Sequence, residues 1–560
     1  MIAFRRLVFA AVAYSAAVGL AVLLAQALAP GGWSVAKLLL FACFLGAAPW
    51  LGVCAGNAVC GFLILLLAWH PARFVLSADL DPDFGDIPPT TALAVTIRNE
   101  DMGLVLPPLR RLLDGLDAAG LGDRFALCVL SDTQDPALAA AEERAVAAFR
   151  IADRRPARIR YRRRAGNDGF KAGNVMEFFD HHADGFAAAI MLDADSVMTP
   201  AAVLRLLRIL HADPRLGIIQ HLTVGLPAEA AFPRLFQFGM RAGMRVWATG
   251  QAWWQGDEGP YWGHNAAVRI APFRAHARLA PLPDGRVILS HDQVEAARLR
   301  AAGWGVCVWA DETGSAERNP PALPEFLHRD ARWLAGNLQY VHLLRAPGFR
   351  PMGRWQLLQA ILLFAGAPLY LAMLCLIAIA VALGETQSVP AGRTLALALA
   401  WSLVLYGPKL LGYAQVLLSA TERARYGGAA RFAVGAASEI VFTLLLDAPA
   451  TVSKTIALVR VLRGAPLRWA PQNREERGVS WREAFDQFWP HTLFGVCVFA
   501  ALLHGSSGAA LWAAPFAGGL LVAIPFCVLT ADPRVSRWLR ERGVAAVPEE
   551  IAAGDPYRRG

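Results

Sequence analysis

Acidic side chains follow three apolar, strand-like segments of the sequence. Asn99 and Glu100 come just after ALAVTIR, Asp132 after LCVLS, and Asp193 with Asp195 after AAIML. Each acid alone has an ordinary explanation, because Asp often caps the helix after a strand or forms an Asx turn. Together they are more informative, since parallel strands end at one edge of a sheet, where ligands bind. Carboxylates gathered there suit Mg²⁺ or Mn²⁺ that bridges a diphosphate.

A second group of reactive side chains stands in VILSHDQVEAARLRAAGWGV, residues 287 to 306. Ser290 and Gln293 match the S-x-x-Q form of a capping box, which predicts a helix that starts there and stops at Gly303. His291 and Asp292 are not needed for that cap. They could form a metal pair, interact with the helix dipole or take part in a reaction, and the segment alone leaves these alternatives open.

Cations and aromatic rings stand between these acids. In GNDGFKAGN the glycines let the backbone approach a ligand, and Lys171 offers a charge to phosphate. In QAWWQGDEGPYWGHNAAVR, Trp262 could stack on a sugar while His264 and Asn265 bind its hydroxyl groups. An aromatic belt at a membrane surface would explain the same rings.

The segment FLHRDARWLAGNLQYVHLL, residues 326 to 344, is typical of an amphipathic helix, because apolar residues recur at steps of three and four. Arg329, Arg332 and Trp333 fall on another face of that helix. They could bind a ligand, or they could be snorkelling side chains at a membrane surface.

The composition indicates a membrane protein with a large polar part. The chain has 560 residues, of which 56% are hydrophobic and 18% charged, and its mean hydropathy is +0.38. A span needs about 20 apolar residues, which predicts about six spans and at most eight. The stretch 432–462 is interrupted by charged residues and is expected to be interfacial or re-entrant. The expected spans are Leu7 to Ala29, Leu38 to Trp69, Leu357 to Leu383, Thr394 to Leu418, His491 to Trp512 and Ala514 to Leu529.

The net charge of +9 is explained by membrane topology. Arg5, Arg6 and the basic segments after the spans place both flanks of each hairpin in the cytoplasm, by the positive-inside rule. No nucleic-acid recognition motif accompanies the charge, so nucleic acid is not an expected partner. The cysteines form no C-x-x-C pair, which argues against a zinc site.

The middle of the chain alternates strand-like and helix-like segments, which indicates a parallel sheet covered on both faces. Helices are expected at 104–119, 137–150 and 200–212. Strands are expected at 92–97, 125–131, 158–164, 187–193 and 216–221.

The motifs in this order resemble the D, D-x-D, T-E-D and Q-x-x-R-W series of processive family 2 glycosyltransferases, which include cellulose and hyaluronan synthases. MLDADSVM, YWGHNAAVR, ILSHDQVEAARLRAAGWGV, RDARW with GNLQ, and SWREAF resemble more closely the glucans biosynthesis glucosyltransferase H family of Gram-negative bacteria. The resemblance covers most of residues 95 to 490. It implies an α/β GT-A-like domain with a doubly wound, mostly parallel sheet, inserted in a multi-span α-helical membrane domain.

The resemblance also implies how the chain is divided. The expected parts are an N-terminal transmembrane hairpin (1–70), a cytoplasmic GT-A domain (71–325), an amphipathic interfacial helix with RDARW (326–354), a transmembrane channel region with an interfacial element near 432–488 (355–530), and a cytoplasmic tail (531–560).

On the donor side, the resemblance assigns Asp132, Asn99 and Glu100 to the nucleoside and Lys171 to the wall of the pocket. Asp193 and Asp195 would bind the diphosphate, directly or as ligands of Mg²⁺ or Mn²⁺. The family's P-x-Y-N-E opening appears here as TIRNE, with Arg98 in place of an aromatic residue.

On the acceptor side, Asp292 would be the general base, kept ionised by the helix dipole. Trp262, His264 and Asn265 would contact the acceptor sugar, and Trp333 would stack on it. The remaining pair, Arg329 and Arg332, would neutralise the leaving diphosphate. Arg329 stands where the family has Gln. His291 replaces a Glu of the family motif, which favours a positioning role over a metal ligand.

The implied activity is processive, inverting transfer of glucose from UDP-glucose into a β-glucan with a 1,2-linked backbone, in the bacterial inner membrane. The implied partners are the growing glucan acceptor, membrane lipids, a periplasmic glucan-biosynthesis protein and acyl carrier protein. A transporter or channel with a nucleotide-binding regulatory domain would use the same spans, although the sequence has no G-x-x-x-x-G-K-[ST] loop for ATP. A metal-dependent phosphotransferase would leave Trp262, Trp333 and the spans without a role.

Overall fold

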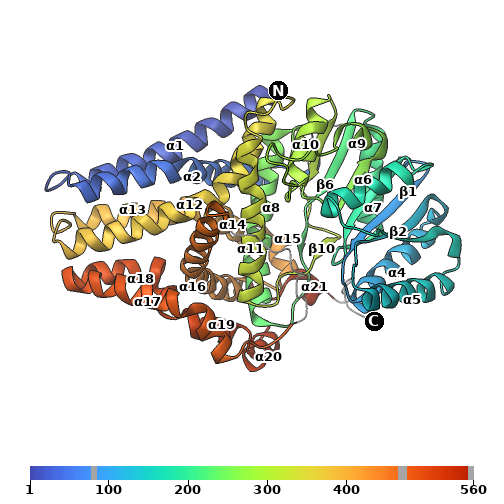
Figure 1. Cartoon of the computed structure of the whole chain (residues 1–560). Coiled ribbons are helices and arrows are strands. Elements are labelled where there is room, and N and C mark those ends of the chain that lie inside the picture. The colour runs from blue at the N-terminus through green and yellow to red at the C-terminus, as the bar shows by residue number, and fades with distance from the viewer. Residues whose placement is uncertain (77–84, 465–475, 553–560) are drawn as a thin grey trace.

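The computed structural model describes residues 1–76, 85–464 and 476–552. An α/β part lies at one end of the molecule and long helices extend from the other, with α8 and α11 at the junction (Figure 1). Part of the predicted interfacial element, and the end of the predicted tail from 553 onward, lie outside the described residues.

The α/β part is built on a seven-stranded sheet of order β3-β2-β1-β4-β8-β6-β9. Neighbouring strands in the described residues are parallel, apart from those that pair with β8. The mostly parallel sheet is therefore confirmed, and β8 is an addition that the strand prediction lacked. The strands are β1 (Thr91–Ile97), β2 (Phe125–Ser131), β3 (Ile159–Arg163), β4 (Ala188–Asp193), β6 (Leu216–His221), β8 (Ala266–Arg269) and β9 (Gly305–Trp309).

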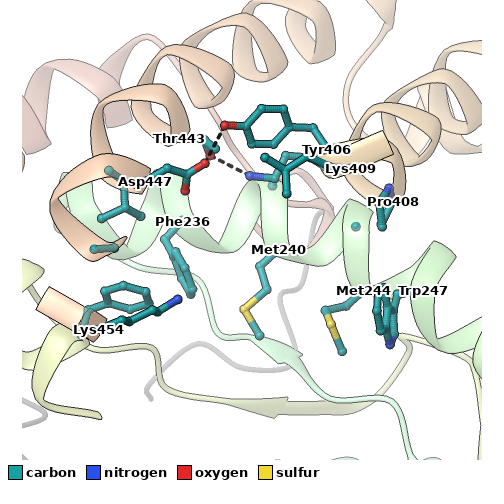
Figure 2. A pocket seen from close by; sticks show the side chains of 16 residues that line it. Phe236, Met240, Met244, Trp247, Tyr406, Pro408, Lys409, Thr443, Asp447 and Lys454 are labelled. Carbon is teal, nitrogen blue, oxygen red and sulfur yellow. Dashed lines mark hydrogen bonds between the residues drawn. The ribbon is translucent and has the colours of Figure 1, made fainter. Parts of the chain in front are cut away.

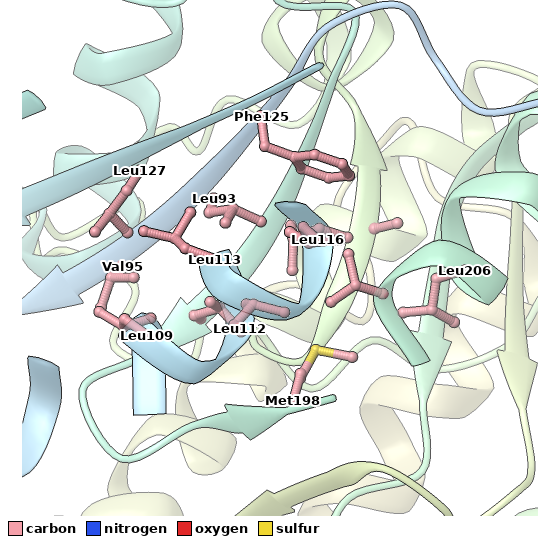
Figure 3. Close-up of a cluster of buried hydrophobic side chains, with 14 of the residues drawn as sticks. Leu93, Val95, Leu109, Leu112, Leu113, Leu116, Phe125, Leu127, Met198 and Leu206 are labelled. Carbon is pink, nitrogen blue, oxygen red and sulfur yellow. The ribbon is translucent and has the colours of Figure 1, made fainter. Parts of the chain in front are cut away.

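Helices cover both faces of this sheet. Alternate residues of β1 point to opposite faces, so Leu93 and Val95 pack against α4 and α7, while Ala92 and Ala94 face α6 and α9. Figure 3 shows the leucines of α4 against β1 and β2. The doubly wound architecture is confirmed. The helices are α4 (Met102–Ala118), α5 (Pro136–Ile151), α6 (Phe170–His181), α7 (Pro200–Ala212), α9 (Ile270–His276) and α10 (Asp292–Ala301).

A small three-stranded sheet lies beside the D-A-D turn. In it β10 (Ser315–Glu317) runs between β5 (Val197–Met198) and β7 (Val224–Gly225). Ser315 pairs with Met198, and Glu317 pairs with Gly225. This sheet brings a segment near residue 317 next to the strand that follows Asp195.

The helical part contains five helices long and apolar enough to cross a membrane, or up to seven if two bent pairs each count as one span, among the described residues. The bent pairs are α13 (Ala391–Leu405) with α14 (Gly407–Leu418), at 78°, and α18 (Ser507–Leu521) with α19 (Ala523–Thr530), at 60°. The five long helices are α1 (Ile2–Leu28), α2 (Val35–Leu67), α12 (Pro351–Ala382), α16 (Ala429–Leu462) and α17 (Trp481–Gly505).

Helix α16 differs from the re-entrant element expected at 432–462, because it is one unbroken helix of 34 residues. The charged residues that argued against a span have partners inside the bundle. Glu439 accepts a hydrogen bond from Lys409 Nζ at 2.6 Å, and Asp447 accepts one from Tyr406 at 2.7 Å. Paired charges inside a helical bundle are compatible with a membrane span.

Helix α8 (Ala231–Gln255) joins the two parts, because its backbone touches that of α2. A Cβ on Gly61 would lie 1.9 Å from the Val246 carbonyl oxygen, and one on Gly250 would lie 2.2 Å from that of Asn57. Only glycine permits such an approach. Trp254 Nε1 also donates to the Asn57 side chain at 2.8 Å.

Ion pairs hold α8 to the C-terminal segment and to the loop before β10. Arg241, 2% exposed, donates to Glu312 at 3.0 Å and to Glu549 at 2.8 Å. Arg234 pairs with Glu550 at 2.6 Å. The remaining helices are α3 (Pro71–Leu76), α11 (Leu323–Leu338), α15 (Ala420–Arg425), α20 (Pro533–Glu541) and α21 (Pro548–Ile551), with 3-10 turns at Gly122–Arg124, Pro156–Arg158 and Gln339–His342.

Candidate active site

The predicted convergence of acidic strand ends is present in the sheet. In the register of β2, β1 and β4, Ile97 lies opposite Ser131, and Thr96 lies opposite Asp193. Asn99, Asp132 and Asp195, which follow these three strands, therefore lie near one another at one edge of the sheet. Asn99 adopts a left-handed backbone conformation with φ 56°, and its N–H donates to Thr133 Oγ1 at 2.7 Å. Glu100, beside it, is half-buried.

Asp132 is held by a residue that the sequence did not single out. Arg164 Nε and Nη2 donate to the two carboxylate oxygens of Asp132, each at 2.7 Å, and both residues are buried. The same guanidinium donates to the carbonyl oxygens of Asp168 at 2.9 Å and Phe170 at 3.0 Å. Asp132 thus fixes the glycine-rich loop that precedes Lys171. Arg164 was concealed in a run of three arginines that could equally have been solvated.

Lys171 lies in the first turn of α6 and forms an ion pair with Asp193. Its Nζ also donates to the carbonyl oxygen of Gly263 at 2.9 Å. Gly263 has φ 82°, and a Cβ there would lie 3.5 Å from Asp292 Cβ, 3.6 Å from Lys171 Nζ and 3.7 Å from His291 Cε1. The backbone at Gly263 is therefore the point where the KAGN, D-A-D, YWGHN and SHD motifs meet.

Asp292 is the first residue of α10, whose N-cap is His291. The predicted cap by Ser290 is wrong, because that residue packs against α11 and the helix begins after it. A Cβ on Gly336 of α11 would lie 2.0 Å from Ser290 Oγ. The predicted stop is confirmed, since α10 ends at Ala301, just before Gly303 at φ 98°.

The pKa of the Asp292 carboxyl is affected most strongly by burial. Burial raises the pKa of this carboxyl above its usual range, and the nearby His291 partly opposes that rise. The backbone N–H of Gln293, at the start of α10, lowers this pKa as the helix-dipole argument predicts, but burial outweighs it. His291 Nδ1 lies 2.9 Å from Glu295 Oε2. Burial lowers the pKa of His291, but the carboxylates of Glu295 and Asp292 together raise it overall.

One end of α11 holds the segment that carries the predicted base. Leu289 N–H donates to Gln339 Oε1 at 2.8 Å, and Gln339 Nε2 donates to the Val287 carbonyl oxygen at 2.9 Å. Tyr340 OH donates to the Ser290 carbonyl oxygen at 2.9 Å. The residues after RDARW thus position Asp292, which the motif comparison did not assign to them.

The middle of α11 carries the predicted diphosphate and acceptor groups. Arg329 is buried, and its guanidinium lies 4.6 Å from the centre of the Trp333 ring. Burial lowers the pKa of Arg329, and the carboxylates of Glu317, Asp330 and Asp195 counteract that effect. Trp333 is 46% exposed, so its ring has a free face for a ligand. Arg332 is half-buried.

Glu317 is a further acidic residue at this site. Its Oε2 lies 3.3 Å from His264 Nε2. Burial raises the pKa of Glu317, His264 and Arg329 lower it, and Asp195 and Asp193 raise it further. Glu317 therefore lies close to residues predicted to bind the donor and to His264, which is predicted to bind the acceptor.

The other predicted acceptor residues are less accessible. Asn265 is fully buried, and its Nδ2 donates to Ser315 Oγ at 2.9 Å, so its side chain supports β10. Trp262 is half-buried, and its backbone N–H donates to Gln220 Oε1 at 2.9 Å. His264 is the member of this group that contacts another charged residue of the site.

The carboxylates of Asp193 and Asp195 fit a metal that is shared with substrate. Among the described residues, no group of three or more His, Cys, Asp and Glu side chains could hold a metal ion. Both aspartates are half-buried at the sheet edge. Mg²⁺ is commonly bound by one or two carboxylates together with water and substrate phosphates, so these two suffice.

A cavity of about 310 Å³ lies in the helical part, between α8, α14, α16 and Phe326 of α11. Met240, Met244 and Trp247 of α8 point into it from one side, as Figure 2 shows. Tyr406 and Asp447 lie on the opposite wall. The cavity therefore combines aromatic and apolar surfaces with hydrogen-bonding groups.

Two family models match overlapping stretches of the chain. The glycosyl transferase family 2 model matches residues 93–276, and the glycosyl transferase family group 2 model matches residues 189–411. The mannosyltransferase PcManGT from Pyrobaculum calidifontis, solved with GDP-Man and Mn²⁺, aligns with a TM-score of 0.42 and 16% identity, covering 66% of this chain and 99% of that one.

Longer similarity is found to proteins named glucans biosynthesis glucosyltransferase H. The protein of Xanthomonas campestris pv. campestris (strain B100) is 33% identical over 544 residues, which are 93% of this chain and 83% of that protein. The protein of Xylella fastidiosa (strain 9a5c) is 32% identical over 545 residues, with 93% and 84% covered. That of Bradyrhizobium diazoefficiens is 32% identical over 558 residues, with 94% and 73% covered.

The sheet, the acidic edge and the family models define a family 2 glycosyltransferase with a GT-A fold, joined to apolar helices that make it a membrane protein. Within that class the similarity extends through nearly the whole chain. The chain belongs to the glucans biosynthesis glucosyltransferase H family and is a glycosyltransferase of glucan biosynthesis.

Proposed function

We propose that this glycosyltransferase transfers glucose from UDP-glucose, with inversion, to a growing β-glucan whose backbone is 1,2-linked. It acts processively at the cytoplasmic face of the bacterial inner membrane and passes the glucan towards the periplasm. The meeting of Lys171, Asp193 and Asp292 around Gly263 is the observation that carries the proposal. It sets a base beside the groups that would bind a diphosphate.

In the proposed reaction, Asp292 takes the proton of the acceptor hydroxyl while that oxygen attacks the anomeric carbon. The bond from that carbon to the diphosphate breaks, and UDP leaves with the electron pair. A carboxyl whose pKa is raised by burial is a stronger base than a solvated one. Lys171, Arg329 and Arg332 supply positive charge for the leaving diphosphate, which needs no proton.

Asp195 and Asp193 would hold Mg²⁺ or Mn²⁺, which supplies charge neutralisation at the diphosphate when bound. In the structure Asp193 is paired with Lys171. Metal or lysine can therefore neutralise the same carboxylate, and donor binding would redistribute these contacts.

The cavity in the helical part supports the proposed route for the glucan. Its wall includes Phe326, one turn before Arg329 on the same helix. Flat aromatic rings with nearby hydroxyl, carboxylate and ammonium groups suit a sugar chain.

Purified protein in nanodiscs, given UDP-glucose with Mg²⁺ or Mn²⁺, should release UDP and form a glucan. Digestion by a β-1,2-specific glucanase then tests the linkage. Absence of UDP release from any sugar nucleotide would contradict the enzymatic proposal. Faster turnover of another sugar nucleotide would contradict the glucose assignment.

Asp292→Asn should abolish turnover while UDP binding is retained, because the amide keeps the shape of the side chain and cannot accept the proton. Asp284→Asn, in an exposed turn where Asp284 pairs with Arg286, is a matched control and should leave turnover unchanged. Loss of UDP binding in Asp292→Asn would move Asp292 to the diphosphate site.

A further inference from the structure

Glu317 occupies a place where an acidic side chain is electrostatically costly. It ends β10, which pairs with the β5 strand that follows the D-A-D turn. Asp193 and Asp195 disfavour the ionised form of Glu317, and burial does so as well. A carboxylate kept in such surroundings is a candidate for a functional role.

The contact of Glu317 points to His264. The two side chains are mostly buried, with 22% and 15% of their surfaces exposed, and Glu317 Oε2 lies 3.3 Å from His264 Nε2. An ionised Glu317 can only accept, so this contact stabilises the form of His264 that carries a proton on Nε2. Glu317 therefore favours Nε2 over Nδ1 as the protonated ring nitrogen of His264.

The second nitrogen of His264 is left for another contact. Nδ1 is buried, and no group among the described residues forms a hydrogen bond with it. With Nε2 protonated towards Glu317, Nδ1 of the neutral ring is an acceptor. A hydroxyl group is the kind of donor that would complete it. A Cβ on the neighbouring residue Gly263 would lie 3.5 Å from the Cβ of Asp292, where the acceptor hydroxyl reacts in the proposed function.

We propose that Glu317 is a positioning residue for the sugar acceptor: its carboxylate fixes the orientation and tautomer of His264, so that Nδ1 receives a hydroxyl group of the acceptor. This inference rests on the proposed function. Because the pair acts on the acceptor, its loss lets water compete with the glucan for the transferred glucose.

The readout is the ratio of glucose built into glucan to free glucose released, at saturating UDP-glucose. Glu317→Ala should lower this ratio about tenfold, which corresponds to the loss of one hydrogen bond to a charged group. Glu317→Gln should retain much of the ratio, because its amide oxygen still accepts from Nε2. The KM for UDP-glucose should change little in both variants.

A double-mutant cycle tests whether Glu317 acts through His264. His264→Ala should lower the ratio as Glu317→Ala does, and the double variant should match either single variant, because both remove the same interaction. Glu325→Ala is the control, since that buried carboxylate pairs with Arg477 at 2.8 Å and lies outside the site. Its ratio should equal that of the wild type.

Melting temperature and size-exclusion profile establish that each variant is folded. If Glu317→Ala does not fold, Glu317→Met, which has a similar length but cannot accept from Nε2, replaces it in the same cycle. A wild-type ratio in Glu317→Ala, or effects that multiply in the double variant, would overturn the inference while leaving the proposed function intact. Absence of UDP release by the wild type would instead remove the proposed function.

Discussion

At the scale of single residues, the site works through pairs of opposite charge held in partly buried surroundings. Asp292 lies beside His291, which is itself paired with Glu295. Burial favours the protonated form of Asp292, and His291 favours the ionised form. The two effects together set the pH range in which this carboxylate can accept a proton.

His291→Gln should move the acid limb of the kcat/KM profile to higher pH. Without the imidazole, the largest effect that opposes burial is lost, and the pKa of Asp292 rises. More of the base is then protonated at a given acidic pH, so activity is lost sooner as pH falls. Substantial activity should remain well above that limb. Arg298→Gln, on the same helix, is the control, and an acid limb that moves to lower pH would contradict the role of His291.

Arg164→Lys should weaken binding of UDP about tenfold, as measured by calorimetry. Lysine cannot form the two-fold contact with Asp132, and the carbonyl oxygens of Asp168 and Phe170 lose their donor. The loop that presents Lys171 is then less ordered. Arg163→Lys changes an exposed neighbour and should bind UDP normally; equal losses in both variants would point to a general charge effect.

At the scale of elements, α11 contributes to both the proposed donor site and the position of the proposed base. Its middle carries Arg329 and Trp333, and its end packs Gly336 against Ser290. A movement of this helix would therefore shift Arg329, proposed to bind the diphosphate, together with Asp292, the proposed base. Glycine is required at position 336 because Ser290 occupies the space that a Cβ would take.

Gly336→Ala should lower kcat with little change in UDP binding. The added Cβ would overlap Ser290 Oγ, and relieving such a clash typically costs 1–3 kcal/mol or moves the backbone. The segment before Asp292 is the part that can move. Ser290→Gly in the same chain removes the overlapping side-chain atoms and leaves the backbone nitrogen 2.9 Å from the added Cβ, so it should restore part of kcat. A lack of any rescue would place the defect elsewhere.

Elements with long apolar runs could be predicted from the sequence, and short ones could not. The strands before Asn99, Asp132 and Asp193 were predicted because each buried run ends in polar residues. Glu317 was missed because β10 has three residues and its partner β5 has two, too few to carry a periodicity. The start of α10 was misplaced because a capping motif describes local geometry, whereas Ser290 is held by α11 from outside the helix.

At the scale of the whole molecule, the turns between α1 and α2, between α12 and α13 and between α17 and α18 lie at the end away from the α/β part (Figure 1). Ser388, between α12 and α13, donates to the Pro30 carbonyl oxygen between α1 and α2 at 2.8 Å. At the opposite end of α1, Arg5 donates to the Trp253 carbonyl oxygen at 3.2 Å. The helices thus leave and return to the side that carries the active site.

A cysteine at Ser388 should react with a membrane-impermeant maleimide added to spheroplasts, because we propose that this end faces the periplasm. Glu143→Cys, exposed on α5, should react only after the membrane is permeabilised. The parent chain, with its native cysteines, gives the background. Labelling of Glu143→Cys in intact spheroplasts would reverse the proposed orientation.

The position of α8 has a consequence for how the protein is made. Its Phe232 packs on Phe442, with ring centres 5.3 Å apart, and its Phe238 packs on Phe432 at 5.3 Å. Ribosomes add roughly 5–20 residues per second, so α16 emerges on the order of ten seconds or more after α8. During that interval the aromatic face of α8 lacks its covering, so the nascent chain needs the membrane or a chaperone to shield that face until α16 has been synthesised.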